Sequence, residues 1–183
     1  MNNCQNLVQQ LLDNHTVSSA RKWIEERGEE EIESLINFLE ELFNKRSFKA
    51  VDFVKYVCCS PNSVFLCMEK VISLLQEGKI EGNLCNHVIS ELHFSISQLS
   101  ECMKESDVIK KAETKIDHLL KTILHSFFKT FNQEANRREI SPEKFLPSEE
   151  QKRNGCIASL ELIPALINTL NTLHPDNKGI FHL

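Results

Sequence analysis

Cysteine and histidine are the residues in this chain whose chemistry could build a site. The chain contains seven Cys and seven His, and thiolate and imidazole are the ligands that structural zinc prefers. Cys85-x-His87 is the one tight pair of the two types, and Cys58-Cys59 is a doublet. A structural zinc site normally needs two close pairs, and Cys85 also falls on the apolar face of its predicted helix. We therefore predict no metal and no cofactor, and interpret these Cys as packing residues.

His118 and His125 share one face of a predicted helix but are too far apart to share a metal. A separation of seven residues is about 10 Å along a helix axis. The sequence also lacks G-x-x-x-x-G-K-[ST], G-x-G-x-x-G and a nucleophile in a Gly-rich elbow. We therefore predict a non-enzymatic protein without catalytic residues.

The composition is that of a folded domain without strong global charge. Apolar residues make up 41% and charged residues 26% of the chain, and the formal net charge is −5. This charge gives no general attraction to nucleic acid or to an anionic membrane. An odd number of Cys without a disulfide spacing is typical of a reducing compartment, either cytoplasm or nucleus. The N-terminus has no secretory signal, and no apolar stretch approaches the roughly 20 residues that span a bilayer, so we expect a soluble intracellular chain.

The spacing of apolar residues predicts an all-α fold of about eight helices. We expect them over residues 4–12, 17–27, 29–44, 48–58, 61–77, 83–105, 107–138 and 148–173. Gly155 and Pro164 lie inside the last of these, so we expect it to kink or break. Residues 1–173 are expected to form a single domain, followed by an irregular tail over 174–183. The unequal lengths favour an irregular antiparallel array, either a HEAT/armadillo-like superhelix or a compact bundle.

The helix expected over 107–138 is amphipathic with an unusually wide apolar arc. At about 100° per residue its apolar side chains cover an arc of roughly 180°. One partner helix cannot cover such an arc, so we expect several helices to pack on it. The expected inward set is Val108, Ile109, Ala112, Ile116, Leu119, Leu120, Ile123, Leu124, Phe127, Phe128 and Phe131.

Two sets of residues are candidates for binding a partner. A basic stripe follows the opposite face of the same helix and could take an acidic peptide or nucleic acid. It consists of Lys111, Lys115, His118, His125 and Lys129. The second set is aromatic, Trp23, Phe38 and Phe94, which are candidates for exposed interface anchors. Each set also has an ordinary explanation. The basic stripe could simply be the solvated face of a core helix, and the aromatic residues could be buried because helices in an array bury more than one face.

The first six predicted helices, to about Glu105, have a texture similar to that of a six-helix death fold such as a caspase-recruitment domain. The similarity runs from Leu39-x-x-Leu42 through Phe53 and Val54. Such a resemblance would imply a signalling adaptor in the N-terminal half. No diagnostic motif of that family is present, and the long helices after Asn83 do not suit a tandem death fold.

The sequence therefore favours a non-enzymatic helical scaffold or adaptor that binds a peptide segment or a helical partner. Its partner would be another protein, and the chain could be a subunit of a larger complex. The alternatives are a nucleic-acid-associated module that uses the basic stripe, and the death-fold-like adaptor.

Overall fold

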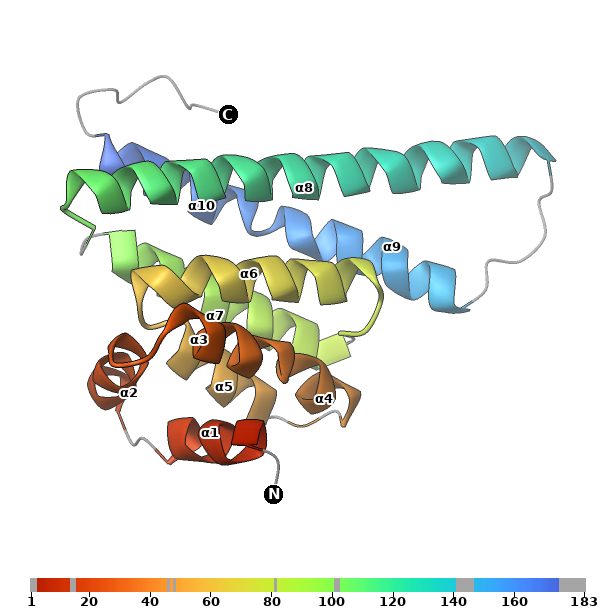
Figure 1. Ribbon diagram of the computed structural model, residues 1–183. Helices are drawn as coiled ribbons and strands as arrows, with labels where there is room; N and C mark the ends of the chain where they lie inside the picture. The colour runs from red at the N-terminus through yellow and green to blue at the C-terminus, as the bar shows by residue number, and fades with distance from the viewer. Residues whose placement is uncertain are drawn as a thin grey trace.

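The computed structural model describes residues 3–13, 16–45, 47, 49–80, 82–100, 103–140 and 147–174. The prediction of an all-α protein is confirmed, since these residues form helices and contain no strand (Figure 1). The helices are α1 (Asn3–Leu12), α2 (Val17–Glu25), α3 (Glu29–Asn37), α4 (Leu39–Asn44), α5 (Lys49–Val57), α6 (Pro61–Gln76), α7 (Gly82–Ser100), α8 (Ser106–Ile140), α9 (Pro147–Leu160) and α10 (Ile163–Leu173). Apart from His174, the tail expected over 174–183 lies outside the described residues.

The helices form layers on either side of α6. In Figure 1, α8 runs along one edge of the molecule with α9 and α10 beneath it, and α1 to α5 lie at the opposite edge. Between these layers, α6 packs against α3, α5, α7, α8 and α9. Together with α7, which packs against α5, α9 and α10, it joins the N-terminal part of the fold to the C-terminal part.

The sequence of α6 explains its central position. A helix that is apolar nearly all round is stable only when neighbours surround it. Its buried apolar residues are Val64, Phe65, Cys67, Met68, Val71, Ile72, Leu74 and Leu75. The helix begins after Ser60, whose hydroxyl accepts a hydrogen bond from the backbone N–H of Asn62, with Pro61 in its first turn. It is followed by Gly78 at φ +71°, a left-handed conformation that favours glycine.

Gly155 allows the backbone of α9 to touch the backbone of α6. A Cβ atom at this position would lie 1.7 Å from the carbonyl oxygen of Leu75 and 2.5 Å from its carbonyl carbon. Only glycine, which lacks Cβ, fits such an approach. The expected break in the last helix is confirmed, but it comes at the turn formed by Glu161 and Leu162, with Pro164 opening α10.

The helices that pack on the apolar arc of α8 leave part of its C-terminal half uncovered. Ala112, Ile116, Leu119 and Ile123 are buried as expected, but three residues of the predicted inward set are exposed. Those residues are Leu124, Phe128 and Phe131, with 41%, 59% and 39% of their surfaces exposed. The reason is length, because α8 extends past the ends of α6 and α10 and continues beside α9 (Figure 1). Leu120 and Phe127 are half-buried.

The segment Ser148–Leu173 is long and apolar enough to cross a membrane by length and composition alone, contrary to the expectation from the sequence. The turn at Glu161 and Leu162 divides it into α9 and α10. Both helices pack against α7 and α8, and 44% of the segment's most apolar window is buried inside the fold. We therefore interpret it as a pair of core helices.

The contact at Gly155 can be tested by adding a single methyl group. Gly155→Ala should destabilise the protein by about 3 kcal/mol or more, because the new Cβ forces α9 away from α6. The measurement is the free energy of unfolding in urea.

Gly28→Ala is the matched control, because nothing lies within 4 Å of a Cβ built there. It should stay within about 1 kcal/mol of the unsubstituted protein. Equal effects of the two substitutions would show that the helices do not meet at Gly155.

Candidate partner-binding groove

In Figure 1, α6 lies between α3 and α8. Residues of these three helices line a groove along α6. It contains two adjoining hollows of about 740 Å³ and 520 Å³ that share Leu66. The larger hollow lies at the start of α6, and the smaller one continues along that helix. Since α6 has 16 residues, it extends about 24 Å, and the groove has room for a few turns of helix or a short extended segment.

The larger hollow combines an apolar floor with a cationic rim. The apolar lining residues are Ile32, Pro61, Phe65, Leu66, Val108 and Ala112. The charged lining residues are the cations Arg27, Lys110, Lys111 and Lys115, with the single carboxylate Glu29. An apolar surface bordered by a few charged groups is typical of sites that anchor a side chain and select its neighbours by charge.

Arg27 is held at the rim of this hollow by Trp23. Its guanidinium carbon lies 3.3 Å from the centre of the Trp23 ring, and its Nη1 donates a 2.6 Å hydrogen bond to the Trp23 carbonyl oxygen. Stacking of this kind favours a cation over the face of an indole ring. Trp23 is half-buried and is not the exposed anchor expected from the sequence, but it fixes a charged group of the groove.

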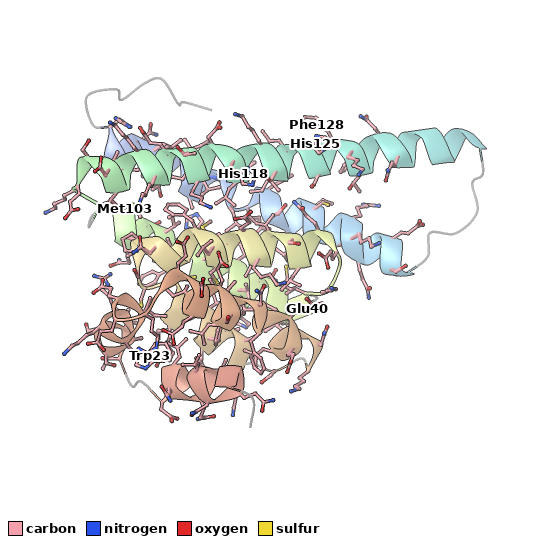
Figure 2. All side chains as sticks on the ribbon, viewed as in Figure 1. Trp23, Glu40, Met103, His118, His125 and Phe128 are labelled. Carbon is pink, nitrogen blue, oxygen red and sulfur yellow. The ribbon has the colours of Figure 1, made fainter. Side chains whose placement is uncertain are left out.

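The predicted basic stripe of α8 divides into two parts. Lys111 and Lys115 line the larger hollow, and Lys115 Nζ lies 4.0 Å from Glu69 Oε2 on α6. His118 is beside them, with its Nε2 3.5 Å from the other oxygen of Glu69. His125 and Lys129 line neither hollow and are exposed farther along α8. Figure 2 shows His125 there.

An ion-pair cluster lies beside the smaller hollow and connects α4 to the end of α6. Lys79 donates a hydrogen bond to Glu40 and lies 2.7 Å from Glu77, and Lys70 Nζ is 3.5 Å from the other oxygen of Glu40. The hydrogen bonds from Lys79 lower the pKa of Glu40 and of Glu77, and the bond to Glu40 raises the pKa of Lys79. The cluster is largely exposed, so its contribution to stability is small.

The other aromatic candidates lie outside the groove. Phe38 is half-buried and packs against the core between α3 and α4, which contradicts the expectation of an exposed anchor. Phe94 is 59% exposed on α7, as expected, but lines neither hollow. The aromatic candidates from the sequence therefore do not line the two hollows, where Phe65 is the one aromatic lining residue among those the structure describes.

Sequence reasoning missed Arg27, Leu66 and Lys110 as groove residues. The spacing of Trp23 and Arg27 could have predicted their contact, because residues four apart lie on the same face of a helix and a guanidinium stacks well on an indole ring. Leu66 is an apolar residue of α6 that the neighbouring helices leave partly exposed. The sequence could not predict this, because it does not show which helices pack around α6.

Three buried cysteines, Cys58, Cys59 and Cys85, are poor nucleophiles at neutral pH. Cys58, Cys59 and Cys85 are free and buried, and burial raises the pKa of Cys59 to about 11 and the pKa of the other two above the ordinary value. A protonated thiol neither attacks a substrate nor holds a metal well. Within the described ranges, no group of three or more His, Cys, Asp and Glu could hold a metal ion.

No family model, no curated protein and no solved structure matches this chain. The chain is therefore classed by its own features, as an all-helical array with an open groove along its central helix. Proposals about its function depend on the chemistry of that groove and of the surfaces around it.

The ion-pair cluster predicts a specific pH dependence. Glu40 and Glu77 have folded pKa values below the ordinary 4.5. Their stabilisation is therefore present above about pH 4.5 and is lost as the pH falls through the folded values. Lys79→Met should lower the free energy of unfolding at pH 7, and the difference from the unsubstituted protein should shrink as the pH falls below about 4.5 and the two carboxylates become protonated.

The measurement is urea unfolding of both proteins across this pH range. Lys45→Met is the control, because it removes the same charge from an exposed pair with Glu41 at 3.7 Å. A Lys79→Met effect that stays constant with pH would contradict the role given to the two carboxylates.

Proposed function

We propose that this protein is a non-enzymatic interaction module, a scaffold or adaptor, whose groove along α6 binds a segment of a partner protein. The single observation that supports this most is the larger hollow, with its apolar floor at Leu66 and Phe65 and its rim of four cations. A monomeric fold gains nothing from leaving an apolar groove open, and such grooves commonly receive side chains of a partner.

The shape of the groove favours a helical or extended segment as its occupant. Amphipathic helices bind in grooves by placing apolar residues from successive turns on an apolar floor. Here Leu66 belongs to both hollows, so one segment lying along α6 would reach the two in sequence. The four cations at the start of α6 favour a segment whose residues at that end are acidic.

The helix arrangement also supports a scaffold role. We propose that the fold is an irregular relative of the layered arrays found in HEAT- and armadillo-like proteins. In such arrays, packed helices hold a binding surface rigid and so lower the cost of ordering it on association. The groove would be preformed by α3, α6 and α8.

The proposal is tested by comparing proteins recovered with the unsubstituted chain and with a groove variant. Leu66→Arg places a charge on the floor of both hollows and should reduce recovery of a groove partner by about tenfold or more. Ser90→Arg adds the same charge at an exposed position on α7 and should leave recovery unchanged. Quantitative mass spectrometry of affinity-purified material gives the ratio.

A second variant distinguishes loss of binding from loss of folding. Lys111→Glu with Lys115→Glu changes two exposed rim residues, so the fold should persist while an acidic segment is repelled. A protein that is lost with both groove variants and kept with Ser90→Arg supports the proposal. If no protein behaves in this way, the proposal is contradicted. If the groove variants instead lose a bound nucleic acid that nuclease digests, the nucleic-acid-associated module is favoured.

A further inference from the structure

The larger hollow of the groove carries more positive charge than its neighbours neutralise. Its charged lining residues are Arg27, Lys110, Lys111, Lys115 and Glu29. The charge of Lys115 is partly offset, because its Nζ lies 4.0 Å from Glu69 Oε2. Within the described part of the chain, the side chains of Arg27, Lys110 and Lys111 have no carboxylate at ion-pair distance. These three cations against the one carboxylate of Glu29 leave the hollow with a net charge of +2.

Arg27 has a side of its guanidinium group that its own neighbours do not use. Its Nη1 donates to the carbonyl oxygen of Trp23, and its guanidinium carbon lies 3.3 Å from the centre of the Trp23 ring. Its Nε is buried and has no hydrogen-bond acceptor among the residues that the structure describes. A buried donor without an acceptor is costly. An anion bound at Arg27 would supply that acceptor.

Two helices begin beside the larger hollow and add to its positive potential. Pro61 and Asn62 belong to the first turn of α6, Val108 belongs to the first turn of α8, and all three residues line the hollow. Figure 1 shows both helices beginning on the same side of the molecule. The N-terminal end of a helix carries a partial positive charge. These ends act in the same direction as the cations and favour an anion of high charge.

The charges farther along α6 favour one compact anion over the backbone of a nucleic acid. The smaller hollow is lined by the carboxylates of Glu33 and Glu69, and the cation Lys70, which also lines it, already lies 3.5 Å from Glu40. A nucleic acid presents a row of phosphates and needs cations at each step. Phosphates that followed the groove would meet these carboxylates. A single anionic side chain on a peptide avoids them.

We propose that the larger hollow binds a phosphorylated serine or threonine of the partner segment, an inference that rests on the proposed function of the groove. A phosphoryl group carries a charge of about −1.5 to −2 at neutral pH and three acceptor oxygens, which matches the charge of the hollow. The planar guanidinium of Arg27 would bind two of these oxygens, and Lys111 the third. An apolar residue beside the phosphorylated one would pack on Leu66. The partner would therefore bind more tightly after phosphorylation.

The test measures how much purified protein is retained by three immobilised peptide libraries. The libraries have random residues around one fixed position, which is phosphoserine or phosphothreonine in the first, serine or threonine in the second and glutamate in the third. The first should retain about tenfold more protein than the second, and high salt should reduce that retention. The glutamate library should retain an intermediate amount, because a carboxylate has one charge and two oxygens.

Arg27→Gln and Lys111→Gln should each reduce retention by the phosphorylated library about fivefold or more. Lys111 is exposed, so this variant keeps its fold even if Arg27→Gln disturbs the packing on Trp23. Lys129→Gln is the matched control, because it removes the same charge from an exposed residue of α8 that lines neither hollow. It should leave retention unchanged.

Equal retention by the phosphorylated and unphosphorylated libraries would overturn the proposal. So would equal losses with Lys111→Gln and Lys129→Gln, or stronger binding of a single-stranded oligonucleotide that the Lys111→Gln protein loses. Treatment of the lysate with a phosphatase separates this proposal from the function of the groove. A partner that Leu66→Arg loses, but that is recovered equally after phosphatase treatment, would leave the groove in place and contradict the phosphoryl site.

Discussion

The arrangement of this protein depends on the place where two helix backbones touch, at Gly155 of α9 and Leu75 of α6. This contact lets α9 lie directly on α6 while it also packs against α8. With α9 seated so closely, the long α8 is held beside α6 and forms one side of the groove. A side chain at position 155 would separate these helices, and the C-terminal layer would then be displaced from the rest of the fold.

The two halves of α8 are covered to different extents by the rest of the fold. Its first half contributes Lys111 and Lys115 to the groove and buries Ile116 and Ile123 in the core. Its second half continues past the body of the fold, where only part of its apolar arc is covered and Phe128 is exposed. The turns of α8 that extend past the body are therefore the reason that part of its apolar arc is exposed.

The sequence predicts the helices well and their neighbours poorly. Apolar periodicity identifies α6 and α8 because it depends only on local spacing, and the stripe at Lys111 and Lys115 leads to two residues that line the groove. Periodicity does not say how far the packed neighbours extend, which is why Phe128 was expected to be buried. Gly155 was expected to kink or break its helix together with Pro164. Its close approach to Leu75 could not be predicted, because it depends on a helix about 80 residues earlier in the sequence.

The most direct test of the groove is hydrogen–deuterium exchange, measured on the protein alone and in complex with a partner. The partner is the protein that the unsubstituted chain recovers and the Leu66→Arg variant does not. Binding along α6 should slow the exchange of backbone amides in residues 29–37, 61–76 and 106–118 and leave exchange in α7 unchanged. The reason is that a bound segment makes local opening of these helices less frequent. Protection confined to α7, or to the first two helices, with none in these three segments would contradict the account.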